Sequence, residues 1–205
     1  KLYAALLVTA IAMTLFITNG TALISLYLTD TAGNGATEVA LAYGKEYLKI
    51  VMIGLVPFAV TQAYATNIKE TGQTFVPMVA SFAAVGSNAV LDFLLIFGIG
   101  PIPKLGVAGA AIATVMSRYI ETIIVVLWAH KNRDRNRYLE GAYRGIGMPF
   151  DEFKTIFIKG LPLMLNELFW AAGMTTVTQC YSVRGLSVNA GLNIATTITN
   201  LFNIV

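Results

Sequence analysis

The chain has 205 residues, of which 56% are hydrophobic and 12% are charged, and its formal net charge is +3. Soluble domains carry about 25% charged residues, so this composition and the mean hydropathy of +0.68 exclude an ordinary soluble domain. The small basic excess lies beside apolar segments, where membrane topology explains it, and we expect no nucleic-acid partner.

Apolar segments follow one another along the chain, each near the roughly 20 residues that a membrane-spanning helix needs. In chain order they cover residues 2–28, 47–67, 74–98, 105–129, 156–181 and 187–205. We therefore expect an all-α polytopic membrane bundle with a transmembrane helix for each segment. The first is too long for a signal-peptide core and is interpreted as a span. Because the chain starts without methionine and ends in an apolar run, we expect an internal part of a longer protein.

Two prolines interrupt these segments. Pro57 lies in the second and Pro162 in the fifth, and each removes a backbone donor and permits a bend. Such bends can serve gating, but proline is also common in passive membrane helices.

The connection 130–150 is the longest polar stretch and is rich in basic residues. The positive-inside rule places it in the cytoplasm, together with the loop at Lys69. Lys45, Lys49 and Arg184 would then be exceptions on the outer side. We expect residues 1–130 to form part of an N-terminal lobe, 131–150 a cytoplasmic connection, and 151–205 the start of a second lobe.

Two acids lie deep inside apolar segments, Asp92 in the third and Glu167 in the fifth. A charged side chain at such a depth costs roughly 3 kcal/mol, so intramembrane acids usually bind an ion, relay a proton or meet a charged substrate. The alternative is a buried ion pair that only fixes helix packing.

Asn88 and Asp92 are one helical turn apart and share a face. Their oxygens can replace part of the hydration shell of Na⁺, and a carboxylate can also carry a proton, so the spacing does not choose between the two ions. A bland role, with Asn88 bonded to a neighbouring helix, remains open.

Around Glu167, the neighbouring Asn166 and the helically spaced Trp170 and Met174 complete a second candidate cluster. An acid beside an aromatic ring can receive an organic cation, although helix packing or lipid contact explains Trp170 and Met174 equally well.

The fourth segment carries Arg118 and Glu121 three residues apart, which we interpret as a structural ion pair. Ahead of them, small residues favour close approach of a neighbouring helix; they are Gly106, Gly109, Ala110, Ala113, Thr114 and Ser117. Thr114 can also offer a hydroxyl ligand.

Enzymatic chemistry has little support in the sequence. It shows no phosphate-binding glycine loop and no nucleophile with a neighbouring base. One cysteine, Cys180, and one histidine, His130, exclude an intrachain disulfide and a structural zinc site. We expect no cofactor.

Three stretches carry a resemblance to the multidrug and toxic compound extrusion (MATE) transporters. They are Asn88-Ala-Val-Leu-Asp92 with the apolar run to Gly98, the small-residue stretch from Leu105 to Thr114, and Gly160-Leu-Pro-Leu-Met-Leu-Asn-Glu167. The motifs around Tyr47 to Pro57 and Lys69 to Thr74 are also similar, so that the resemblance covers essentially the whole chain.

The resemblance implies helices three to eight of a twelve-helix, two-lobe antiporter that expels organic, often cationic, compounds in exchange for Na⁺ or H⁺. It implies a first-lobe cation site at Asn88 and Asp92, with Thr114 and Tyr47 as further candidates. Glu167 then matches a second-lobe acid that binds cation or substrate, with Asn166 and Trp170 beside it.

We expect a multi-pass protein of the bacterial plasma membrane that works on small organic cations and needs no obligate protein partner. Two alternatives are a lipid-linked saccharide flippase of similar architecture, which would need a cationic cavity, and a non-transporting membrane scaffold. The chain alone is not expected to transport, because missing helices would leave polar faces exposed to lipid.

Overall fold

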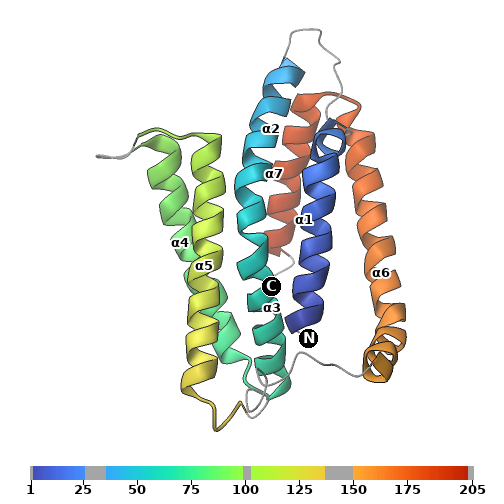
Figure 1. The fold of residues 1–205 in the computed structure, drawn as a ribbon. Helices are drawn as coiled ribbons and strands as arrows, with labels where there is room; N and C mark the ends of the chain where they lie inside the picture. Colours follow the sequence, from blue (N-terminus) through green and yellow to red (C-terminus); the bar gives the residue numbers. More distant parts are fainter. Residues whose placement is uncertain (1, 26–35, 99–102, 137–149, 203–205) are drawn as a thin grey trace. The chain divides into compact units, whose positions relative to one another are not determined.

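A computed structural model describes residues 2–25, 36–98, 103–136 and 150–202. Within these ranges the chain folds into α-helices without strands, which confirms the all-α expectation (Figure 1). The helices are α1 (Leu2–Ser25), α2 (Ala36–Ile53), α3 (Leu55–Glu70), α4 (Phe75–Phe97), α5 (Val107–Lys131), α6 (Phe150–Ser182) and α7 (Leu186–Phe202).

Helices α1, α4 and α5 are each long and apolar enough to cross a membrane, and the bent pair α2–α3 can make a fourth span. Within the described residues, α6 and α7 do not meet the same criterion. The predicted span in α6 contains the polar pair Asn166 and Glu167. Helix α7 has 17 residues, fewer than the roughly 20 that a spanning helix needs.

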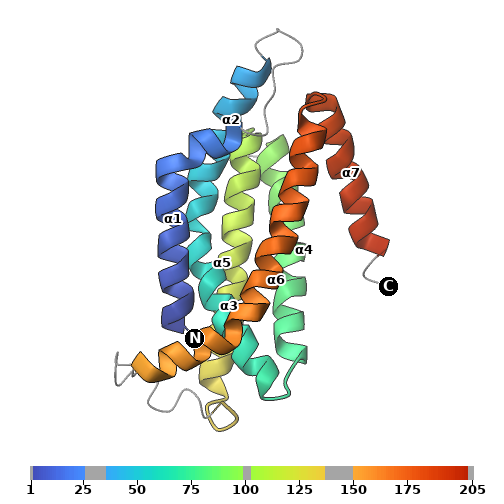
Figure 2. The ribbon, with the colours of Figure 1, turned by 90° about the vertical axis from the view of Figure 1, so that its right-hand side faces the viewer.

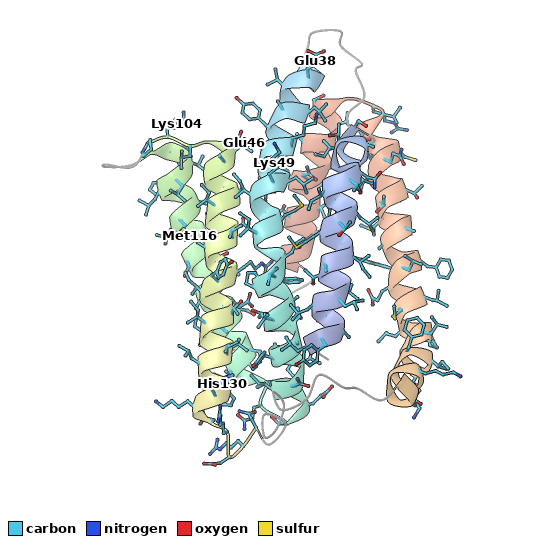
Figure 3. The ribbon with its side chains drawn as sticks, viewed as in Figure 1. Glu38, Glu46, Lys49, Lys104, Met116 and His130 are labelled. Atoms are coloured by element: carbon cyan, nitrogen blue, oxygen red, sulfur yellow. The ribbon has the colours of Figure 1, made fainter. Side chains whose placement is uncertain are left out.

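The helical pair that contains the predicted second span, 47–67, begins earlier than that segment and is bent, as Pro57 predicted. It begins at Ala36 and breaks at Gly54, and the two parts are bent by 45°. Glu46 and Lys49 lie within α2 and not in a loop (Figure 3), because Glu and Lys are good helix formers and a Glu–Lys pair at this spacing supports a helix. Lys45 lies in the same helix.

The bend itself was expected from Pro57, and its position follows from local chemistry. Proline lacks the N–H that would bond the carbonyl one turn earlier, so the ladder is interrupted just before it. Gly54 lies at the break between α2 and α3, and its N–H donates a hydrogen bond to the carbonyl of Val51 at 2.9 Å. A Cβ on Gly54 would lie 3.3 Å from the side chain of Val115.

The chain divides into two compact units. One comprises Lys1–Gly20 and Ala42–Arg144, and the other comprises Thr21–Leu41 and Gly145–Val205. Residues 137–149, most of the predicted connection 131–150, lie outside the described residues, and the predicted lobe boundary stays a prediction.

In the first unit, α3, α4 and α5 pack side by side (Figures 1 and 2). Their shared core contains Tyr64 and Ile68 of α3, Ala80 of α4, and Val125 and Ala129 of α5. Of these helices, α4 carries Asn88 and Asp92, and α5 carries Thr114.

In the second unit, α6 packs against α7. Figure 2 shows that the first turns of α6 run at an angle to the rest of the helix. Pro162 lies inside this helix and weakens its backbone ladder, as the sequence predicted.

Candidate functional site

The first candidate site lies along one stripe of α4. Ser81, Asn88 and Asp92 are separated by two turns and then by one turn, so the helix carries all three on the same side. Asn88 and Asp92 are both partly buried.

The polar atoms of this pair are incompletely satisfied. Asn88 Nδ2 and Asp92 Oδ1 are buried, and neither has a hydrogen-bond partner in the described part of the chain. A buried carboxylate oxygen without a donor is costly, and such groups are rare unless an ion, a water or another segment completes them. Rotation of the Asn88 side-chain amide by 180° about its Cβ–Cγ bond exchanges the positions of its nitrogen and oxygen, so that the oxygen can face the same space. The pair is thus suited to a small cation.

The packing of α4 on α5 places Thr114 opposite this pair. Ser81 Oγ donates to Glu121 Oε1 at 2.8 Å, which fixes where the two antiparallel helices meet. Moving two turns forward along α4 from Ser81 reaches Asn88, and moving two turns back along α5 from Glu121 reaches Thr114. The Thr114 hydroxyl donates to the carbonyl of Ala110 at 3.0 Å, so its oxygen lone pairs stay available as an acceptor.

Small residues make this close packing possible. A Cβ on Gly109 would lie 2.7 Å from the carbonyl oxygen of Leu95, so only glycine fits there. At the C-terminal end of α4, Gly98 caps the helix with a left-handed φ of 70°. The backbone N–H of Leu105 donates a hydrogen bond to the carbonyl oxygen of Leu95 at 3.0 Å. The predicted close approach is present at Gly109, whereas a Cβ on Gly106 would meet nothing within 4 Å.

Tyr47 is not joined to this pair by any hydrogen bond in the residues that the structure describes. It lies on α2, on the other side of the Gly54 break from α3, with 37% of its surface exposed. Its role as a cation ligand stays a prediction.

The second candidate cluster lies on α6, in the other unit. Asn166 and Glu167 are adjacent and exposed, and Trp170 is 66% exposed. Trp170 and Met174 follow Glu167 at helical spacing, as predicted from the sequence. This part of the chain therefore offers an acid beside an exposed aromatic ring.

The Arg118–Glu121 pair is present, with Nη1 and Oε2 3.3 Å apart. Sequence analysis missed its third member, Ser81, which ties the pair to α4. The sequence does not single out Ser81, because Ser87 lies on the same helix and only the packing of α4 on α5 distinguishes the two serines. Sequence analysis also missed Thr61 of α3, whose hydroxyl lies 2.8 Å from that of Thr122 on α5.

Comparison with known proteins shows a similarity to MATE transporters. A family model described as MatE matches residues 1–94. A "Probable multidrug resistance protein NorM" of Thermotoga maritima is 26% identical over 77% of this chain and 33% of its own length. The protein of the same name from Bacillus subtilis is 27% identical over 74% of this chain and 34% of its own length.

A third relative, named "FAD transporter", from Shewanella oneidensis is 39% identical over 40% of this chain and 18% of its own length. No solved structure matches the chain significantly. The chain is thus similar to MATE transporters, over residues 1–94 by the family model and over about three quarters of its length by the NorM relatives. It spans about a third of the length of the NorM relatives.

Proposed function

We propose that this chain is part of an efflux antiporter that expels small organic, often cationic, compounds from bacteria in exchange for Na⁺ or H⁺. The observation that carries the proposal is the buried Asn88–Asp92 pair, whose Nδ2 and Oδ1 atoms lack partners in the described residues. The similarity of the chain to MATE transporters also supports a transporter.

In this mechanism the coupling ion binds at Asp92, with Asn88 and Thr114 as supporting oxygen ligands. An ion shifts a conformational equilibrium only by its difference in affinity between the two states. Asp92 binds the ion strongly where its carboxylate is dry and releases it where water reaches the site. Ion binding thereby drives the change between outward-open and inward-open states.

Residues 1–130 contribute to one lobe and residues 151–205 to the other in this proposal. The rocking of two lobes around a central site is a general route to alternating access. The bent α2–α3 span suits such movement, because an interrupted helix can change its angle at less cost than a continuous one.

Glu167 is the proposed contact for a cationic cargo or for a second coupling ion. Charge attraction and the exposed Trp170 ring both favour an organic cation. The relative named a FAD transporter makes a flavin dinucleotide, which is anionic, the second candidate cargo. A lipid-linked saccharide would need cationic groups in the cavity, and the one arginine within α5, Arg118, is already paired with Glu121.

The test is efflux from proteoliposomes that contain the full-length protein, with Na⁺ and H⁺ gradients imposed separately. A panel of cationic dyes and flavin adenine dinucleotide is offered as cargo. We expect one gradient to drive efflux of the dyes. Efflux of the flavin alone would change the cargo class, and no gradient-driven efflux of any compound would reject the proposal in favour of a scaffold.

A further inference from the structure

A polar pocket opens between α3, α4 and α5, outside the Asn88–Asp92 pair. It has a volume of about 170 Å³, enough for several water molecules. All of its lining residues belong to the first compact unit. Its polar lining comprises Thr61, Gln62, Lys69, Thr74, Ser81 and Glu121.

The pocket reaches from one end of the helices toward the middle of α5. Lys69 and Thr74 lie where α3 ends and α4 begins. The same end of α5 carries His130, opposite Lys104 at the start of that helix (Figure 3). Lys131 and Arg133 follow, so the positive-inside rule makes this the cytoplasmic end.

At its inner end the pocket is lined by a buried carboxylate. Glu121 is only 7% exposed, and its Oε1 accepts a hydrogen bond from Ser81 at 2.8 Å. Its Oε2 faces Arg118 at 3.3 Å, which is long for a charge-assisted bond. The Arg118 side chain is 42% exposed and its guanidinium lies over the ring of Phe58 at 4.9 Å. Arg118 therefore has a second favourable contact when it moves away from Glu121.

The pocket and the candidate ion site lie along one side of α4. Ser81 lines the pocket, and Asn88 and Asp92 follow it two and three turns along the same stripe. On α5, Glu121 and Thr114 are likewise two turns apart. Oxygen-bearing side chains thus recur along the facing sides of α4 and α5 between the pocket and Asp92, at intervals of one or two turns.

We infer that this pocket is the cytoplasmic station through which the coupling cation leaves the Asn88–Asp92 site. The inference rests on the proposed function. A small hydrated monovalent cation, Na⁺ or hydronium, would meet the hydroxyls of Thr61 and Ser81, the amide oxygen of Gln62 and the carboxylate of Glu121. Lys69 also lines the pocket, and its positive charge lowers the affinity of the pocket for a cation.

Water access is tested in a cysteine-free full-length protein in which Cys180 is also replaced. Ser81→Cys is compared with Phe82→Cys, whose native side chain is 71% exposed on a different face of α4. A positively charged, membrane-impermeant methanethiosulfonate is added to inverted vesicles. We expect it to modify Ser81→Cys at least about 10-fold faster. Equal rates, or no reaction at Ser81→Cys, would overturn the inference.

The role of Glu121 is tested by Glu121→Gln, with Glu121→Asp as the conservative variant and drug binding as the check on folding. We expect Glu121→Gln to lower efflux turnover by about 10-fold with drug affinity unchanged, and Glu121→Asp to restore part of it. If the coupling ion is Na⁺, the substitution changes how efflux turnover depends on the cytoplasmic Na⁺ concentration. If the coupling ion is a proton, the substitution changes how efflux turnover depends on cytoplasmic pH. A purely structural residue would change neither.

The two proposals fail in different ways. If Asp92→Asn abolishes gradient-driven efflux while Glu121→Gln leaves its ion dependence unchanged, only the station is wrong. If Asp92→Asn leaves the gradient dependence intact, the coupling site itself is wrong.

Discussion

Individual residues determine how closely α4 and α5 approach, and hence whether Asn88 can lie near Thr114. Gly109 is the tightest point, since a Cβ there would lie 2.7 Å from the carbonyl oxygen of Leu95. Backbone atoms cannot yield as a flexible side chain does, so any larger residue must separate the helices.

We therefore predict that Gly109→Ala destabilises the full-length protein by about 1–3 kcal/mol. The matched control is Gly86→Ala on α4, where a Cβ would meet nothing within 4 Å. That change should be neutral or stabilising by up to about 1 kcal/mol, because alanine favours a helix. Unfolding in mixed detergent micelles measures both. Equal effects of the two substitutions would show that the α4–α5 approach does not depend on Gly109.

The residue chemistry of the site was partly predictable. Asn88 and Asp92 were recognised from their spacing within an apolar run, and Arg118 and Glu121 from theirs. Ser81 was not, because a single serine in a membrane helix commonly bonds its own backbone, as Ser87 does to Ala83 at 2.6 Å. Only the packing of α4 against α5 distinguishes these two serines.

Among the helices, the α2–α3 pair has the feature most relevant to movement. Thr122 of α5 lies 2.9 Å from the carbonyl of Pro57, so α5 holds the start of α3 beside the break. Restoring the missing N–H at Pro57 should allow a continuous helix.

We predict that Pro57→Ala straightens the bent span, which lengthens the distance between spin labels at positions 43 and 66 by about 2–3 Å for a rise of 1.5 Å per residue. Efflux should slow. Pro77→Ala is the control, because Pro77 lies in the first turn of α4, where its missing N–H has no helical partner to lose. Pulsed electron spin resonance measures the distance. An unchanged distance in Pro57→Ala would assign the bend to Gly54 alone.

Element boundaries were predicted within a few residues where apolar runs end in glycine or proline, as α4 does at Gly98. The start of α2 was missed because its first turns are polar, with Glu38 near the helix N-terminus, where a negative charge is favourable. Hydropathy marks the membrane-embedded part of a helix and not the helix itself.

At the scale of the whole molecule, the direction of the proposed transport depends on which end of the helices faces the cytoplasm. Lys69, Lys131, Arg133 and Arg135 lie at one end of the α3–α5 core. Basic residues near span ends are retained in the cytoplasm during insertion.

We predict that Arg133→Cys in a cysteine-free background reacts with an impermeant thiol reagent only after cells are opened. Lys104→Cys, at the opposite end of α5, should react in intact cells. Labelling of the two variants in spheroplasts and in broken membranes provides the measurement. The reverse pattern would invert the topology and place the Glu121 pocket on the outer side.

The resemblance to MATE transporters and the helical core could be predicted from the sequence, whereas the pocket at Glu121 could not. Its walls come from three helices, and the polar side chains that each contributes are of ordinary types. Their convergence depends on the register of α4 and α5, which the Ser81–Glu121 bond reveals.

The most direct measurement is ion-driven efflux by Asp92→Asn in proteoliposomes of the full-length protein, with Asp134→Asn, an exposed acid after α5, as control. We predict that Asp92→Asn folds and binds dye within about twofold of wild type but loses at least about 10-fold in gradient-driven efflux, or about 1.4 kcal/mol. Asp134→Asn should transport normally. Undiminished coupled efflux by Asp92→Asn would contradict an ion site at this carboxylate.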